Sequence, residues 1–301
     1  MFNADEVLRR NVEALTATSD MEQKMTPPGR APLPSIQALR EIIDMVKTVI
    51  FPEFYDRRRN CRSIRSAVIA INLEKIYSKL TREVINGFQF DPRTTCDDAQ
   101  TVGSALSLRF IDMLPEIKRL LYTDVQAMYD NDPAVDDYGE IILSYPVVQA
   151  MVNYRTAHAL LDLGVPALPR IITELAHSET GIDINPGAVI GEYFAIDHGS
   201  GVVIGQTSII GNHVTLYQGV TLGAKNFTLD DNGHPVNVPR HPIIEDNVTI
   251  YSGASILGRI TVGHDSVVGG NVWLTHSVPP YSRILQPEAL TSTRNLQMTP
   301  Q

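Results

Sequence analysis

The sequence has few features that would suggest a disulfide or a membrane segment. Its 301 residues include only two cysteines, Cys61 and Cys96, and these form no Cys-x-x-Cys pair. We therefore expect reduced thiols in a reducing compartment, the cytoplasm. No apolar run approaches the roughly 18 residues that a membrane span requires. The amino-terminal residues also lack the basic start and the continuous apolar stretch of a signal peptide, so we expect a cytoplasmic protein without a membrane partner.

An excess of positive charge is missing as well. The chain has 25 Lys and Arg residues against 34 Asp and Glu, which gives a formal net charge of -9. Proteins that bind along nucleic acid need clustered Lys and Arg to neutralise phosphates, so we predict no nucleic-acid partner. Hydrophobic residues make up 43% of the chain and charged residues 20%, which is typical of a globular protein.

The first part of the chain has the hydrophobic spacing of helices. Between about residues 35 and 178, apolar residues recur three and four positions apart, as they do at Ile36, Leu39, Ile42, Ile43 and Val46. This spacing gives each helix one apolar face. We predict a loosely held amino-terminal arm over residues 1–34 and a helical domain over residues 35–180.

After about residue 182 a period of six replaces the helical period. The repeat positions are Ile184, Ile190, Ile196, Val202, Ser208, Val214, Val220, Ile244, Ile250, Ile256, Val262, Val268 and Leu274. Twelve of these thirteen residues are Ile, Val or Leu, and a six-residue unit is one short strand with one tight turn. Three such units close a triangular coil, and successive coils stack like paired strands.

We therefore expect an α+β chain in which the helical domain precedes a parallel β-helix over residues 181–281. The six-residue pattern resembles that of hexapeptide-repeat proteins, and this resemblance implies a left-handed β-helix. The repeat lapses between about residues 226 and 243, where the sequence is polar and rich in proline. We predict that this segment is a loop extruded from the β-helix, and that residues 282–301 form a tail.

An acid and a histidine are adjacent at Asp197 and His198, and Asp183 precedes this histidine by a little less than one coil. Asp183 would therefore lie one layer below His198, slightly out of alignment with it. A carboxylate bonded to one imidazole nitrogen leaves the other nitrogen free to take a proton from a hydroxyl. His198 is thus a candidate general base. The alternative is an exposed turn histidine, which we expect His213 to be.

Two further groups could bind charged parts of a substrate. Arg240 and His241 close the extruded loop, and a guanidinium binds a carboxylate through two hydrogen bonds, although an ordinary exposed loop charge is the alternative. Asp132 could bind an ammonium group, but the residues alone favour a helix cap. Because no two histidines of the repeat have the short spacing of zinc ligands, we expect no metal.

Six blocks of the sequence, in this order, resemble the serine acetyltransferase family of hexapeptide-repeat enzymes. They are Asp132-Pro-Ala-Val-Asp136, Tyr154-Arg-Thr-Ala-His158, Gly181-Ile-Asp-Ile-Asn-Pro186, Ile196-Asp-His-Gly-Ser-Gly201, Gln218-Gly-Val-Thr-Leu-Gly223 and Arg240-His-Pro242. The resemblance covers about residues 125–280. It implies transfer of an acetyl group from acetyl-CoA to the hydroxyl of L-serine, on the route to cysteine. The alternative is another hexapeptide O-acetyltransferase that acts on a sugar or xenobiotic hydroxyl.

The resemblance implies a role for each candidate residue on the serine side. His198 would deprotonate the serine hydroxyl, and Asp183 would orient it. Asp132 and Asp197 would hold the ammonium group and the hydroxyl, which reverses the preference for a helix cap at Asp132. The serine oxygen would attack the thioester directly, through an oxyanion that backbone N–H groups stabilise.

Arg240 would take the serine carboxylate, and His241 would line the same pocket. The resemblance also implies a homotrimer, or a dimer of trimers, in which acetyl-CoA lies between neighbouring β-helices as a co-substrate; no cofactor is bound permanently. The residues expected near acetyl-CoA are Gly223, Ala224, Ser252 and Gly270, with Lys225 and Arg259 as candidates for its phosphates.

Two regulatory partners follow from the same resemblance. L-Cysteine would act as a feedback inhibitor at the serine site. In the family, a terminal isoleucine inserts into the active site of O-acetylserine sulfhydrylase, but this chain ends at Gln301. A polar amide is a poor apolar anchor, so we predict weak or no binding of that enzyme.

Overall fold

The computed structural model describes residues 3–26, 32–56, 62–91, 99–226, 228–234 and 236–287. Cys61, Cys96 and Gln301 lie outside these ranges, so the predictions that rest on them stay predictions. Within the described residues the helices are α1 (Ala4–Thr16), α2 (Asp20–Met25), α3 (Ile36–Ile50), α4 (Pro52–Tyr55), α5 (Arg62–Phe90), α6 (Ala99–Asn131), α7 (Tyr138–Ser144), α8 (Pro146–Asp162) and α9 (Leu168–Thr180). None of these helices is long and apolar enough to cross a membrane.

The predicted helical domain forms its core from the apolar faces of its helices. Helix α3 begins after Ser35, whose side chain accepts a hydrogen bond from the backbone N–H of Ala38 and so caps the helix. Leu39, Ile42 and Val46 of this helix are fully buried, as their spacing predicts, whereas Ile36 in the first turn is exposed. Helices α1 and α2, within the predicted arm, bury no residue.

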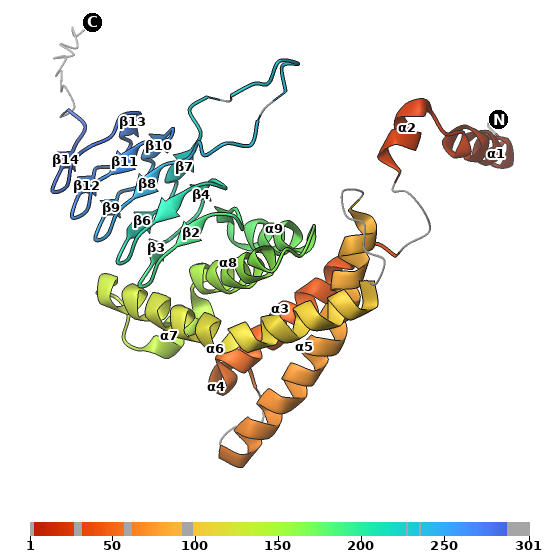
Figure 1. Cartoon of the computed structure of the whole chain (residues 1–301), viewed down its shortest axis with the longest axis horizontal. Helices are drawn as coiled ribbons and strands as arrows, with labels where there is room; N and C mark the ends of the chain where they lie inside the picture. Colours follow the sequence, from red (N-terminus) through yellow and green to blue (C-terminus); the bar gives the residue numbers. More distant parts are fainter. Residues whose placement is uncertain are drawn as a thin grey trace, which may run out of the picture.

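A parallel β-helix follows the helices (Figure 1). Its strands are β1 (Asp183–Ile184), β2 (Val189–Ile190), β3 (Ala195–Asp197), β4 (Val203–Ile204), β5 (Ile209–Ile210), β6 (Thr215–Tyr217), β7 (Thr221–Gly223), β8 (Ile243–Ile244), β9 (Thr249–Ile250), β10 (Ser255–Leu257), β11 (Thr261–Val262), β12 (Val267–Val268), β13 (Trp273–Leu274) and β14 (Arg283–Ile284). They form three sheets with the orders β1-β4-β7-β10-β13, β11-β8-β5-β2 and β14-β12-β9-β6-β3, which we call sheets A, B and C. The predicted left-handed β-helix is confirmed.

The first coil is longer than the repeat predicts. Ile184 pairs with Ile204, whereas three six-residue units would pair it with Val202. The prediction that Val202, Ser208, Val214 and Val220 continue the series of Ile184 and Ile190 is therefore wrong. Ile204, Ile210, Leu216 and Leu222, each two residues later, take these strand positions. Val202 is buried, but it lies just before strand β4, and Ile204 takes the position inside the strand. The two additional residues lie in the corner that carries His198.

The predicted extruded loop is present between β7 and β8, and Figure 1 shows it projecting from the side of the β-helix. Leu222 pairs with Ile256, whereas a coil of regular length would end at Arg240, so the loop is an insertion within this coil. Ile244 then pairs with Val262, as three six-residue units predict. The coil that follows the loop thus has the regular length.

Side chains of α8 form hydrogen bonds with the backbone of the first coil. The Tyr154 hydroxyl donates a hydrogen bond to the carbonyl oxygen of Ala188 at 2.7 Å, and Nδ1 of His158 donates to that of Pro186 at 2.8 Å. Arg155 donates to the carbonyl of Gly191 at 2.9 Å. The block from Tyr154 to His158 is therefore a joint between the two parts of the chain.

Candidate active site

His198 lies at a corner of the β-helix, between sheet C and sheet A. Its backbone is left-handed, with a φ of 58°, and Gly199 follows with a φ of 80°. The corner between Asp197 and Gly201 has two residues more than the corresponding corner between Tyr217 and Gly219 in the next coil. This expansion projects the imidazole outward, with 75% of the side chain exposed. A histidine so placed can reach a hydroxyl group outside the β-helix.

Two carboxylates lie near His198. Nε2 of His198 is 3.8 Å from Oδ1 of Asp197, which is an electrostatic contact and too long for a hydrogen bond. Asp132 follows the end of α6, and its Oδ1 accepts a hydrogen bond from the backbone N–H of Ala134 at 2.9 Å. Its Oδ2 accepts one from the Tyr145 hydroxyl at 2.5 Å. A pocket between the helices and the first two coils is lined by Asp132, Tyr145, Asp197 and Thr215, together with Met128, Asn131, Ala195 and Ile196.

Hydrogen bonds shift the pKa values of Asp132 and Tyr145 in this pocket. Donation by Tyr145, then by the backbone of Ala134, lowers the pKa of Asp132, and the positive charge that His198 can carry lowers it further. The same carboxylate raises the pKa of Tyr145 to about 12. Asp132 is therefore ionised and Tyr145 protonated at neutral pH, so this carboxylate offers a negative charge to a cationic group such as an ammonium.

The prediction from the residues alone, that Asp132 caps a helix, is wrong. Asp137 caps α7, because its Oδ1 accepts hydrogen bonds from the backbone N–H groups of Gly139 and Glu140. Asp132 instead lies beyond the carboxyl end of α6, where its side chain lines the pocket. The physical reason is that the helix starts only after Asp137.

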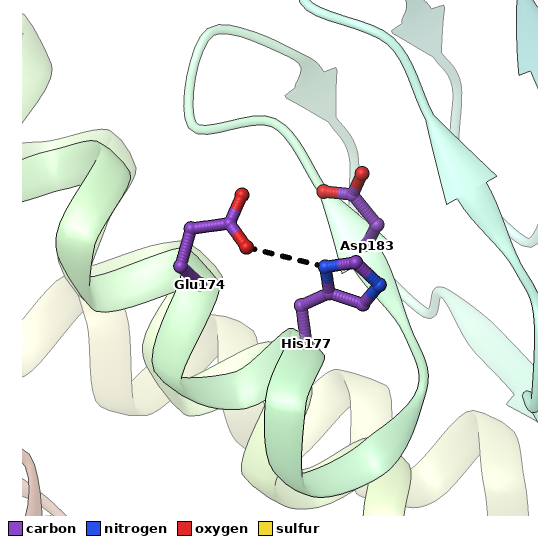
Figure 2. A group of neighbouring side chains, drawn as sticks. All are labelled: Glu174, His177 and Asp183. Carbon is purple, nitrogen blue, oxygen red and sulfur yellow. Dashed lines mark hydrogen bonds and ion pairs between the residues drawn. The ribbon is translucent and has the colours of Figure 1, made fainter.

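Asp183 lies on strand β1, in a cluster of charged residues from α9 (Figure 2). Its Oδ1 accepts a hydrogen bond from Arg170 at 3.2 Å, and Arg170 also pairs with Glu174. Nδ1 of His177 is 3.2 Å from Glu174. No hydrogen bond between Asp183 and His198 is found in the part of the chain that the structure describes, and the predicted pairing of these two residues stays a prediction.

This cluster is also a possible metal site. One ligand atom each from Glu174, His177 and Asp183 lies within 4.8 Å of the others. However, the guanidinium of Arg170 already pairs with both carboxylates and supplies the positive charge that a metal would bring. We therefore treat the cluster as an ion-pair network, and the absence of a metal stays a prediction.

Arg240 and His241 lie at a different corner, between sheet A and sheet B. The backbone N–H groups of both residues donate to the hydroxyl of Thr207, at 2.9 Å and 3.1 Å. The His241 side chain is buried, and this burial, with the charges of Arg240 and Arg259, lowers its pKa to about 4. His241 is therefore neutral at physiological pH, whereas the Arg240 guanidinium hydrogen-bonds within its own loop, to Asn237 and Val238.

The predicted site residues at the corners of the β-helix divide between two columns that flank sheet A, whereas Asp132 follows α6 and Asp183 and Asp197 lie on strands β1 and β3. The column between sheets C and A, which we call the histidine edge, holds His198, Gln218, Ser252 and Gly270. The column between sheets A and B, which we call the arginine edge, holds Thr207, Ala224, Lys225, Arg240, His241 and Arg259, with Gly223 at the end of strand β7 beside it. Each edge carries part of the predicted serine contacts and part of the predicted acetyl-CoA contacts.

At the arginine edge, Arg259 supports the corner that holds His241. One of its guanidinium nitrogens donates to the carbonyl oxygens of Thr207 at 2.6 Å and of His241 at 3.0 Å. The backbone of Gly258 packs against Lys225, which places Lys225 and Arg259 in adjacent coils. Tyr145 and Thr207 are the two residues near the candidate site that sequence reasoning missed, because neither belongs to a chemical motif.

A β-helix of six-residue repeats with a projecting histidine beside carboxylates is the fold and site of a hexapeptide-repeat acyltransferase. The serine acetyltransferase encoded on a plasmid of Synechococcus elongatus is 46% identical over 262 residues, covering 85% of this chain and 82% of that protein. The chain belongs to the serine acetyltransferase family. No protein-family model matches the chain.

Solved structures agree with this assignment. Serine acetyltransferase 1 of Entamoeba histolytica, in complex with L-cysteine, superposes with a TM-score of 0.71 at 35% identity, covering 80% of this chain and 85% of that one. Soybean serine acetyltransferase complexed with serine gives a TM-score of 0.55 at 25% identity, covering 84% of this chain and 98% of that one. The likeness includes both the helices and the β-helix.

Proposed function

We propose that the chain is a serine O-acetyltransferase that transfers the acetyl group of acetyl-CoA to the hydroxyl of L-serine, giving O-acetyl-L-serine and CoA in the cytoplasm. The observation that carries the proposal is the projecting His198 beside a pocket with two carboxylates, in a chain of this family. The Asp132 and Asp197 carboxylates would hold the serine ammonium. This orientation brings the serine hydroxyl toward His198.

In the proposed mechanism His198 removes the hydroxyl proton as the serine oxygen attacks the thioester carbonyl. A C–O bond forms, the carbonyl oxygen becomes an oxyanion that backbone N–H groups stabilise, and the C–S bond then breaks. The proton on His198 passes to the departing CoA thiolate, so the base is regenerated. Asp183 would orient His198, which requires its carboxylate to turn from Arg170 toward the imidazole.

The serine carboxylate is assigned to Arg240, with His241 beside it. A single chain holds these residues at the arginine edge, and His198 at the histidine edge. The stretch from Val202 to Thr207 separates the edges, and at roughly 3.3 Å per residue it is on the order of 15 Å long, too wide for one serine to span. We therefore propose that each site forms between the histidine edge of one copy and the arginine edge of its neighbour in a homotrimer. Two trimers could pair further into a hexamer.

Acetyl-CoA is assigned to the groove between the same two edges. Ser252 and Gly270 would contact it from one copy, and Gly223 and Ala224 from the neighbour. Lys225 would face the phosphates, because Arg259 is engaged with backbone carbonyls. L-Cysteine shares the ammonium and carboxylate of serine, so we assign feedback inhibition to the serine pocket.

The acceptor is tested by thiol release from acetyl-CoA with a panel of hydroxyl compounds. We expect saturable thiol release with L-serine, accompanied by O-acetylserine in the mass spectrum, and only background release with a sugar or an aromatic alcohol. The carboxylate-lined pocket is the reason, because neither alternative acceptor carries an ammonium group. Release with the sugar and none with serine would overturn the assignment in favour of another hexapeptide O-acetyltransferase.

The shared site is tested by mixing two impaired variants. His198→Asn damages the histidine edge and Arg240→Ala the arginine edge, so each homotrimer should have little activity. The two variants are unfolded, mixed in equal amounts and refolded together, so that they form random trimers. An intact site then forms wherever the histidine edge of an Arg240→Ala copy meets the arginine edge of a His198→Asn copy. This occurs at about a quarter of the interfaces. We expect activity to return to about that fraction of the unmodified enzyme.

The control for this mixture is each variant refolded alone by the same procedure. Mixing His198→Asn with a second variant of the same edge, Asp197→Ala, should restore nothing, because neither copy then contributes an intact histidine edge. Equal recovery in both mixtures, or none in either, would contradict a site shared between copies.

A further inference from the structure

The His241 imidazole is held at the arginine edge by contacts that determine which of its nitrogens carries the proton. Its Nδ1 lies 3.1 Å from the backbone nitrogen of Thr207, which donates a hydrogen bond to it. A backbone N–H group can only donate, so Nδ1 must offer a lone pair. A neutral imidazole with an unprotonated Nδ1 carries its proton on Nε2.

The hydroxyl of Thr207 leads to the same tautomer. Its oxygen accepts hydrogen bonds from the backbone N–H groups of Arg240 and His241, at 2.9 Å and 3.1 Å. A hydroxyl has two acceptor lone pairs and one proton, so both lone pairs are used and the proton remains. This proton points to Nδ1 of His241, 2.8 Å away, whose single lone pair is shared between the hydroxyl and the backbone N–H of Thr207. Every hydrogen-bonding group of Thr207 at this corner therefore has a defined partner.

The ring is also fixed in position. It lies directly over Gly205, where a Cβ atom would come within 1.9 Å of its Cδ2, so no larger residue fits beneath it. Arg259 donates hydrogen bonds to the carbonyl oxygens of Thr207 and His241, which holds the backbone of both residues. No hydrogen bond of Nε2 occurs within the described ranges of the chain, so its proton is available to a ligand.

The ring is neutral in the pH range where most enzymes work. Two charged groups act on the His241 ring, namely the guanidinium of Arg240 in the loop and that of Arg259 in the corner after β10. Burial and these two charges oppose protonation and lower the pKa of His241 to about 4. An ordinary histidine, with a pKa near 6.5, would gain charge as the pH fell below 7.

We propose that Thr207 is a positioning residue that locks His241 as the neutral Nε2–H tautomer, so that His241 donates a fixed hydrogen bond to the serine carboxylate beside the charge of Arg240. The inference rests on the proposed function. It assigns the two residues different tasks, since Arg240 supplies the charge and His241 supplies a directed donor. Binding of the carboxylate then stays independent of histidine protonation through the mildly acidic range.

The kinetic test compares Thr207→Val with Thr207→Ser. Valine keeps the shape of threonine but removes the hydroxyl, whereas serine keeps the hydroxyl. We expect Thr207→Val to raise the KM for L-serine about tenfold, the effect of losing roughly one hydrogen bond. The KM for acetyl-CoA should be unchanged, and Thr207→Ser should retain the KM for serine of the unmodified enzyme. Equal kinetics in the threonine and valine enzymes would overturn the proposal, as would equal loss in the valine and serine variants.

A second readout does not depend on activity. In solid-state NMR spectra of protein labelled with 15N at its eight histidines, the His241 signals, identified by their loss in His241→Gln, should show a protonated Nε2 and an unprotonated Nδ1 from pH 5 to pH 8. In Thr207→Val the backbone N–H of residue 207 still donates to Nδ1 at 3.1 Å, but the shorter bond from the hydroxyl is lost, so the fraction of the Nδ1–H tautomer should rise above that of the unmodified protein. A mixture already present in the unmodified protein would refute the lock. If serine supports no thiol release, the proposed function fails, while the spectra still decide the tautomer.

Discussion

Replacing His198 by asparagine will lower kcat for acetyl transfer to L-serine by about 100- to 10,000-fold, the usual contribution of a general base. Asparagine is chosen because the residue has a φ of 58°, a conformation that asparagine tolerates better than alanine. The KM values should change little, since the serine ammonium and carboxylate are assigned to other residues. Steady-state thiol release measures the effect, with gel filtration to verify that the variant has the oligomeric state of the unmodified enzyme.

The matched control is His213→Asn. His213 is also at a corner of the β-helix, with a φ of 55°, and its ring stacks on Tyr193 at 4.4 Å. Loss of this contact should lower stability slightly and leave the rate of acetyl transfer unchanged. A His198→Asn enzyme as active as the His213→Asn enzyme would remove His198 from the mechanism.

Breaking the buried ion pair between α6 and α8 will lower the free energy of unfolding by about 3–5 kcal/mol. Asp124 and Arg155 form two hydrogen bonds, at 2.7 Å and 2.8 Å, and their side chains are only 1% and 4% exposed. Asp124 also accepts a hydrogen bond from the backbone N–H of Phe194 in the first coil. Asp124→Ala leaves the Arg155 charge buried without its partner, and chemical denaturation followed by circular dichroism measures the cost.

An exposed pair in the same region provides the comparison. Arg119 of α6 pairs with Glu192 of the first coil at 2.9 Å, with side chains 47% and 39% exposed. Solvent screens such a pair, so Arg119→Ala, which also removes the exposed pair with Glu116, should lower the free energy of unfolding far less than Asp124→Ala. Replacing both buried partners together, as Asp124→Leu with Arg155→Met, should recover much of the lost stability, because neither charge is then buried alone. If Asp124→Ala and Arg119→Ala lowered the free energy of unfolding equally, burial would not be what makes the Asp124–Arg155 pair important for stability.

The sequence period was sufficient to predict the β-helix, because an inward position in a short strand must be apolar in every coil. Ile184, Ile190 and Ile196 are buried as the period predicts. The length of the first coil could not be predicted this way. Its two additional residues lie in the corner where His198 and Gly199 adopt left-handed backbone conformations, and the six-residue spacing continues through Val202 in a different structural position.

The candidate site was predictable in its chemistry and not in its arrangement. The residue types alone identify the candidate acids, the candidate base and the candidate guanidinium of the site. Only the strand register shows that His198 and Arg240 lie on opposite sides of sheet A. Tyr145 and Thr207 act through hydrogen bonds to Asp132 and His241, which are far from them along the chain. Contacts of that separation carry no local signal in a single sequence.

The contacts of α8 with the first coil cover one end of the β-helix. A parallel β-helix ends in a coil whose backbone groups have no further coil to bond, and such an end can polymerise with the end of another molecule. Here the carbonyl oxygens of Pro186 and Ala188 in the first coil are already taken by His158 and Tyr154. The helical domain therefore covers this end of the β-helix and prevents a second molecule from stacking on it through these carbonyl groups.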